Sequence, residues 1–425
     1  MKRYIVREEY FGCLIYDKKN KNYLRKDRDF FETLEKAYNN DLNNDVEEDL
    51  CKDEYLVNGN INFELIYNKN KRDNLLSAPK RIHLLSTSKC NMGCKHCYTQ
   101  KLCVTKEMNY DERLNLLNQM EKNGIYEIYI GGGEPFVSPY FYEFLDECIK
   151  RKMSIKVFTN GLALSDDVIK KISGLDLAYL AISMDGINED EYEKVRGVRK
   201  FGEVLKKIVK LKSVAKYPVD LSVTINNFNK HHPKEFLELS KISGVDRVKI
   251  RAIKANNNVE MKNPIYIDAR EYKNFVIDLF KEYYKKYKNE FELVVYWEDF
   301  VLEYDEEKQS IDIENYKLDF IGGCYASKES MVIDSGGNAS PCGFLPKELQ
   351  NTKVDNINKK DLLDIWTTGE NFEKLRKVFV TEECINCSYY GNCYGGCLAR
   401  KMMENNSLVG TETWCLKKHF PERAR

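Results

Sequence analysis

The cysteines constrain this chain more than any other feature of its sequence. Ten of the 14 cysteines form two groups, three between Cys90 and Cys97 and seven between Cys324 and Cys415. In a secreted chain so many thiols would predict a disulfide framework, but the sequence begins without a secretion signal. Clustered thiols without that signal favour iron–sulfur or zinc ligation.

The first group has the spacing C-x3-C-x2-C, formed by Cys90, Cys94 and Cys97. Three thiolates this close in sequence can hold three irons of a 4Fe–4S cluster. The next cysteine, Cys103, falls outside the spacing, so one iron is left open to a small molecule. Zinc is the alternative, because His96 lies inside the run and zinc sites often combine Cys with His.

This triplet resembles that of the radical S-adenosylmethionine (SAM) enzymes. The resemblance implies that SAM binds the open iron through its amino and carboxylate groups. It also implies that an electron from the cluster splits a C–S bond of SAM and yields a 5′-deoxyadenosyl radical. Cys90, Cys94 and Cys97 are then the residues on which catalysis depends.

The resemblance extends to the residues expected to contact SAM. The run Gly131-Gly132-Gly133-Glu134-Pro135 follows a predicted strand, where glycines let the backbone approach a ligand and a carboxylate can accept from an ammonium group. In the family this motif holds the SAM amino group. Tyr98 resembles the aromatic residue near the adenine, and Ser183 resembles a contact on the ribose side. Weaker candidates for the ribose or carboxylate, each of which could instead be a cap or form a surface ion pair, are Asn160, Arg196, Asn226 and Arg251.

The seven C-terminal cysteines resemble the SPASM domain of radical SAM peptide maturases. A zinc ribbon is the alternative, but it would use four of the seven and leave three without a role. The resemblance implies two auxiliary 4Fe–4S clusters, which makes three clusters in all. The distal cluster is assigned to Cys384, Cys387, Cys393 and Cys415, and the proximal cluster to Cys324, Cys342 and Cys397.

Some relatives supply an eighth cysteine just before the first of the seven. Here residues 319–323 contain none, so the proximal cluster is expected to keep an open iron that a substrate thiolate could bind. The alternative is that Cys103 or Cys148 folds across to close it.

From residue 79 to about residue 300, strands alternate with helices, which predicts a parallel α/β architecture. Six predicted strands from Arg81 onwards indicate an open partial (β/α)6 TIM barrel, which is also the fold of the radical SAM family. Polar residues follow the strand ends, where parallel barrels build their active sites. We predict three domains: a module over residues 1–78, the barrel over 79–300, and a bridging region with the SPASM domain over 301–425.

Residues 1–78 are predicted to form a β-hairpin, a helix over 27–39, a second helix near 46–51 and a further hairpin over 56–67. This outline resembles the winged-helix-like peptide-recognition element fused to maturases of ribosomally made peptides. In that element the leader segment of the precursor peptide would add as a strand beside the hairpin. The alternative is an N-terminal extension that packs on the catalytic domain.

Charge and hydropathy exclude several classes of partner. The 67 basic residues match the 67 acidic ones, so no basic field favours nucleic acid or anionic lipid. No apolar run approaches the length of a membrane span. We therefore expect a cytoplasmic protein that binds neither nucleic acid nor membrane.

Together these features predict an enzyme that abstracts a hydrogen atom from a precursor peptide and installs a crosslink. If the proximal iron is open, the crosslink is expected to be a cysteine thioether, as in the sactipeptide and ranthipeptide maturases. The expected reductant is flavodoxin or ferredoxin. The enzymatic alternatives are a carbon–carbon crosslink and a sulfatase-type formylglycine product. The alternatives outside enzymes are an iron–sulfur electron carrier and a redox-responsive DNA-binding regulator.

Overall fold

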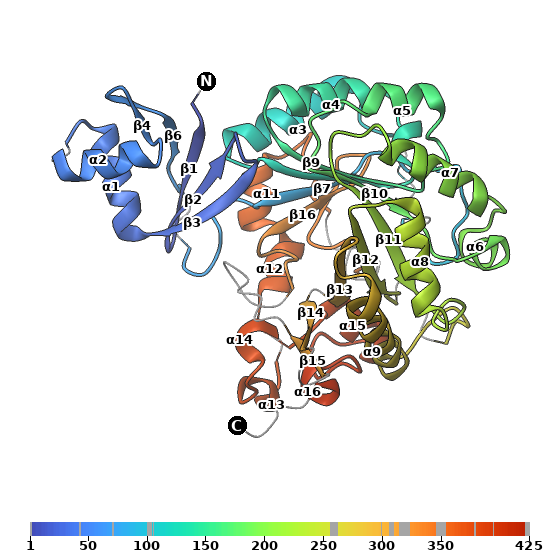
Figure 1. Ribbon diagram of the computed structural model, residues 1–425. Helices are drawn as coiled ribbons and strands as arrows, with labels where there is room; N and C mark the ends of the chain where they lie inside the picture. The colour runs from blue at the N-terminus through green and yellow to red at the C-terminus, as the bar shows by residue number, and fades with distance from the viewer. Residues whose placement is uncertain are drawn as a thin grey trace.

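The computed structural model describes residues 2–41, 44–69, 72–99, 104, 106–255, 262–298, 300–305, 310–313, 324–345, 354–377, 380–393 and 395–420. Cys103 and residues 319–323 lie outside the described residues. Figure 1 shows the N-terminal module beside a large twisted sheet that helices cover, with short helices of the C-terminal region at the lower end of the view.

The large sheet has eleven strands in the order β15-β14-β13-β12-β11-β10-β9-β8-β7-β16-β17. Its central strands are parallel and pair in sequence order. They are β7 (Arg81–Leu85), β8 (Glu127–Gly131), β9 (Ser154–Thr159), β10 (Tyr179–Ser183), β11 (Val219–Ile225), β12 (Arg247–Ala252) and β13 (Glu292–Trp297). This confirms the predicted partial parallel barrel.

Helices alternate with these strands along the chain. They are α3 (Tyr110–Lys122), α4 (Phe141–Lys150), α5 (Asp166–Ile172), α6 (Glu189–Arg196), α7 (Phe201–Lys212), α8 (Pro233–Ser243) and α9 (Ala269–Lys286), with a short 3-10 turn η1 (Pro135–Val137) after β8. Local sequence sets several of their starts: Asn109 and Asp268 each form a capping box at α3 and α9. Fully buried apolar residues on the strands, such as Ile128 and Val157, join the core that these helices cover.

The sheet extends beyond the six predicted strands on both sides. β13 adds in parallel to β12, and β16 (Ser330–Ile333) adds in parallel to β7. Antiparallel strands finish the two edges: β14 (Phe300–Asp305) and β15 (Ser310–Ile313) on one side, and β17 (Ala339–Ser340) on the other. The polypeptide after residue 301 therefore returns to the barrel sheet, and the domain boundaries themselves stay a prediction.

The N-terminal module is a four-stranded sheet in the order β3-β2-β1-β6. Its elements are β1 (Tyr4–Glu9), β2 (Gly12–Asp17), β3 (Asn22–Asp27), α1 (Arg28–Tyr38), α2 (Asn44–Lys52), β4 (Leu56–Val57), β5 (Asn60–Ile61) and β6 (Phe63–Ile66). The hairpin predicted over 56–67 forms only between β4 and β5. The strand β6 lies outside this hairpin and pairs in parallel with β1. Phe31 and Leu34 of α1 pack on Val6 and Ile15 to form a separate small core, in which Cys13 is also buried.

A buried polar contact fixes the module to the barrel. Arg7 is 2% exposed and donates to the backbone oxygens of Ala78, Pro79 and Asn123, at 3.0, 3.0 and 3.2 Å. Its guanidinium also pairs with the fully buried Glu9, at 2.7 Å between Nε and Oε1. The Arg7 side chain therefore joins β1 to the connection before β7 and to the end of α3.

The C-terminal region carries short helices: α11 (Leu362–Thr368), α12 (Glu370–Arg376), α13 (Glu382–Ile385), α14 (Tyr390–Cys393), α15 (Leu398–Asn405) and α16 (Leu416–His419). Two tryptophans anchor it, since the ring nitrogen of Trp297 donates to the Trp414 oxygen at 2.9 Å and that of Trp366 donates to the Leu76 oxygen at 2.8 Å. Within the described part of the chain, no helix combines the length and the apolar character that a membrane span requires.

Candidate active site

The C-x3-C-x2-C loop follows β7, so it lies at the carboxyl ends of the parallel strands, where the sequence placed the site. Cys94 is buried, Cys97 is half-buried and Cys90 is exposed. Burial raises the pKa of the Cys90 and Cys94 thiols. Iron binding must therefore supply the free energy that keeps these two groups as thiolates.

Each of the three sulfurs lies next to a polar group, as cluster thiolates require. Asn160 donates its Nδ2 hydrogen to Cys90 Sγ at 3.7 Å, and Arg196 donates to Cys94 Sγ at 3.6 Å. Cys97 Sγ lies 3.1 Å from Thr99 Oγ1. Two of the weaker SAM candidates, Asn160 and Arg196, thus contact the predicted cluster ligands directly. Arg196 is 7% exposed, so its expected alternative as a surface ion pair is wrong.

The glycine run after β8 packs against the cluster loop itself. Gly133 donates to the Thr87 oxygen at 2.7 Å, and Glu134 donates its backbone hydrogen to the Lys89 oxygen at 2.9 Å. A Cβ on Gly133 would stand 1.9 Å from the Lys89 oxygen, and one on Gly132, whose φ is +116°, would stand 2.8 Å from the Thr87 oxygen. These glycines therefore permit a close approach between two backbones, in addition to the ligand contact that the sequence suggested.

Glu134 is fully buried and braces the ends of β8 and β9. Its Oε1 accepts from the Thr159 hydroxyl at 2.7 Å and from Phe136 N at 3.3 Å, and its Oε2 accepts from Asn160 N at 2.8 Å. Burial raises its pKa. A carboxylate can accept about four hydrogen bonds, so this one retains capacity for an ammonium donor.

Tyr98 lies between the cluster loop and the C-terminal region. Its ring stacks on that of Phe344, with 4.4 Å between centroids, and Gly343 leaves room for the contact. Phe344 in turn donates its backbone hydrogen to Cys342 Sγ at 3.4 Å. The residue after Cys97 therefore touches the residues beside a predicted proximal ligand, and the sequence did not indicate this contact.

The other SAM candidates occupy different places. Ser183 is half-buried at the end of β10 and pairs with Ser222 of β11. Asn226 is fully buried and braces its own turn, accepting from Phe228 N and donating to the Thr224 oxygen. Arg251 is exposed near the carboxyl end of β12, and its guanidinium lies over the Tyr296 ring, 4.6 Å from the centroid. Pro135 is buried and begins the turn η1 after the glycine run.

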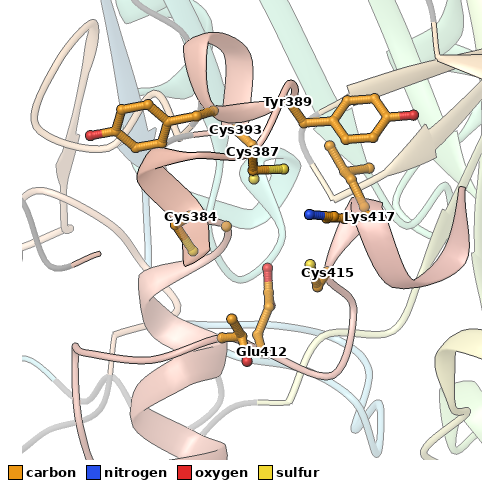
Figure 2. A pocket seen from close by; sticks show the side chains of 12 residues that line it. Cys384, Cys387, Tyr389, Cys393, Glu412, Cys415 and Lys417 are labelled. Atoms are coloured by element: carbon orange, nitrogen blue, oxygen red, sulfur yellow. The ribbon is translucent and has the colours of Figure 1, made fainter. Parts of the chain in front are cut away.

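The four cysteines assigned to the distal cluster line one pocket. The pocket has a volume of about 360 Å³. Figure 2 shows Cys384, Cys387, Cys393 and Cys415 around it, with Glu412 at its edge. Burial raises the pKa of the Cys393 thiol to about 12. Among the residues that the structure describes, no three His, Cys, Asp or Glu side chains converge as they would around one metal ion. A 4Fe–4S cluster needs a wider arrangement, because each thiolate binds a different iron.

The cysteines assigned to the proximal cluster lie in a second group. Cys397 is buried and Cys342 is half-buried within one apolar cluster. Burial raises the pKa of the Cys397 thiol, and the nearby Cys324 adds to that shift. Cys148 is fully buried in the barrel core on α4, so it is not placed to close this set. Cys103, the other cysteine considered as a fourth ligand of the proximal cluster, lies outside the described residues.

Comparison with known proteins decides between the chemistries that these thiols could support. Residues 84–240 match the model of the radical SAM superfamily, and residues 324–393 match the SPASM model, an iron–sulfur cluster-binding domain. The chain contains a radical SAM domain and a SPASM domain. Its domains imply SAM and 4Fe–4S clusters as cofactors, and the thiol sets described above fit them.

Relatives of this radical SAM enzyme are distant in sequence. The mycofactocin maturase MftC of Mycolicibacterium smegmatis is 22% identical and covers 80% of this chain and 84% of its own length. An AdoMet-dependent heme synthase of Methanosarcina barkeri is also 22% identical, over 80% of this chain and 97% of its own length. The structure of Streptococcus suis SuiB bound to its precursor peptide SuiA has a TM-score of 0.74 at 18% identity, over 97% and 98% of the two chains. The match to SuiB extends over the N-terminal module. It establishes that the two chains share a fold.

Proposed function

We propose that this radical SAM enzyme modifies a ribosomally made precursor peptide and joins a cysteine sulfur of that peptide to one of its carbons. The observation that carries the proposal is the proximal cysteine set, which holds Cys324, Cys342 and Cys397 and has no fourth cysteine just before Cys324. A peptide cysteine could complete this set. When bound, SAM and its cluster would supply a 5′-deoxyadenosyl radical that takes one hydrogen atom from the peptide carbon. The peptide thiol would lose its proton, and the remaining electron would pass to an auxiliary cluster.

The position of the proximal set supports the proposal. Through Phe344, the loop that carries Cys342 stacks on Tyr98, which directly follows Cys97. A peptide sulfur held at the proximal set would therefore lie on the side of the SPASM region that faces the SAM-cluster loop. MftC and the SuiB–SuiA complex support a peptide substrate, because one is named a maturase and the other was solved with its precursor.

The N-terminal module offers an edge for the leader segment of the peptide. β3 is an outer strand of the module sheet, so its backbone groups on one side are available to a further strand. Leu24 is 38% exposed on this strand, and Arg25 is exposed beside it. We propose that the leader pairs with β3 and that residues 1–78 serve as its recognition module.

The reductant is proposed to be flavodoxin or ferredoxin. Lys89 and Lys95 are both exposed, and they flank Cys90 and Cys94 in the cluster loop. Acidic electron carriers are attracted to such positive positions near a cluster. We therefore propose that the reductant docks on the side of the loop that carries Lys89 and Lys95.

The proposal is tested by co-expressing the enzyme with candidate precursor peptides encoded beside its gene. We expect the modified peptide to lose two hydrogens and one alkylatable thiol, because a C–H and an S–H are replaced by a C–S bond. A loss of two hydrogens that leaves every thiol alkylatable would indicate a carbon–carbon crosslink. Conversion of a cysteine to formylglycine would change the mass differently. Either result would overturn the thioether assignment.

A further inference from the structure

A buried polar network lies behind the SAM-cluster loop, and the proposed function makes no use of it. Its centre is Asp185, which is fully buried in the S-x-D-G run after β10. Arg196 Nη2 lies 2.6 Å from Asp185 Oδ2, and His96 Nε2 lies 3.4 Å from the same oxygen. Arg196 reaches forward with its other terminal nitrogen, Nη1, and donates to Cys94 Sγ at 3.6 Å.

The backbone around this network holds its members in place. Thr224 N donates to Asp185 Oδ1 at 2.7 Å, and the Asn229 side chain donates to the backbone oxygen of Asp185 at 3.0 Å. Arg196 is the last residue of α6, whose end packs on the cluster loop. Lys95 N donates to the Val195 oxygen at 2.9 Å. Gly197, with φ of +78°, ends α6 so closely that a Cβ would stand 2.9 Å from the Gly93 oxygen.

Two opposite charges form the core of the network. The Arg196 cation lies next to Cys94 Sγ, and the Asp185 anion pairs with the other terminal nitrogen of Arg196. Because both side chains are buried, water screens their charges only weakly.

We propose that Arg196 is a positioning residue that sets the reduction potential of the SAM cluster, and that Asp185 holds it and limits its effect. Reduction adds negative charge to a cluster. A cation that donates to a ligand sulfur therefore favours the reduced form, and an anion nearby opposes it. The inference rests on Cys94 as a cluster ligand and is independent of what the enzyme does to a peptide.

Two substitutions should shift the potential in opposite directions. Arg196→Gln removes the cation and leaves Asp185 unpaired, so the midpoint potential should fall. Asp185→Asn leaves the cation without its counter-charge, so the potential should rise. We expect each substitution to change the equilibrium constant for one-electron reduction at least about tenfold. A tenfold change corresponds to a shift of about 59 mV in the midpoint potential.

The measurement is an anaerobic redox titration of the fully loaded protein, followed by electron paramagnetic resonance. Only the part of the signal that changes on adding SAM is scored, which separates the SAM cluster from the auxiliary clusters. Arg199→Gln is the matched control, because Arg199 follows α6, is 57% exposed at its side chain and pairs with Asp190 and Glu193. It should leave the potential unchanged.

Arg196→Lys is a second variant that keeps the test possible if Arg196→Gln fails to load iron. It keeps the charge and loses the forked geometry, so its potential should lie between those of the wild type and Arg196→Gln. A lower potential for Arg196→Gln with a higher one for Asp185→Asn, or the intermediate value for Arg196→Lys with an unchanged Arg199→Gln, supports the inference. Shifts in the same direction, shifts of the reversed signs, or potentials equal to that of the wild type overturn it.

Discussion

A Gly133→Ala substitution is expected to empty the SAM-cluster site while the auxiliary clusters remain. The new methyl group would stand 1.9 Å from the Lys89 oxygen and 2.6 Å from its carbonyl carbon, so one of the two backbones must move. Movement there breaks the hydrogen bonds that Gly133 N and Glu134 N donate to the loop before Cys90. The thiols at Cys90, Cys94 and Cys97 would then lose the geometry that one cluster requires. We expect on the order of four irons fewer per chain and no reductive cleavage of SAM, measured by iron analysis and by 5′-deoxyadenosine formation.

Gly131→Ala provides the matched control, because it lies two residues away in the same run. A Cβ on Gly131 would meet only Phe158 Cβ, at an ordinary 3.8 Å. This variant should retain its iron. If Gly133→Ala behaves in the same way, the close packing of the glycine run on the cluster loop does not hold the site together.

An Arg7→Ala substitution is expected to destabilise the N-terminal module strongly. It would leave the fully buried Glu9 carboxylate without its cation and three backbone oxygens without a donor. Removing one partner of a buried pair typically costs about 3–5 kcal/mol. Urea unfolding and limited proteolysis should show the module detaching from the barrel before the barrel unfolds.

The pH dependence of the Arg7→Ala defect gives a second check. Burial raises the pKa of Glu9, and Arg7 opposes that shift. Without Arg7 the folded-state pKa should rise further above the unfolded-state value, so folding favours the protonated carboxyl and the defect should shrink as pH falls. Arg25→Ala, which removes an exposed arginine of the same module, should have little effect at any pH. A defect that grows as pH falls would contradict this account of the contact.

The sequence was sufficient for the parts of the site that depend on local spacing. The triplet at Cys90, Cys94 and Cys97 sets the chemistry, and the alternation of apolar strands with capped helices sets the barrel. Each depends on residues close together in the chain, and the physical constraint on them is strong: thiolates must reach one cluster, and parallel strands need a crossover helix. The structure and the family match agree with both predictions.

Contacts between distant segments could not be predicted in the same way. The stacking of Tyr98 on Phe344, the hydrogen bond from Arg196 to Cys94, and the pairing of β16 with β7 each join segments that no local pattern connects. Gly133 shows the difference most clearly. Its sequence motif suggested a backbone free to approach a ligand, whereas its fold places another backbone against it.

The most direct test of the proposed peptide chemistry is to follow the hydrogen that leaves the peptide. The purified, cluster-loaded enzyme is mixed with SAM, a reductant and the precursor peptide carrying deuterium on carbon, and the 5′-deoxyadenosine is analysed by mass spectrometry. If the enzyme abstracts a hydrogen atom from the peptide, the 5′-deoxyadenosine gains one deuterium as the peptide loses its alkylatable thiol. If a modified peptide forms while the 5′-deoxyadenosine carries no deuterium, hydrogen abstraction from the peptide is contradicted.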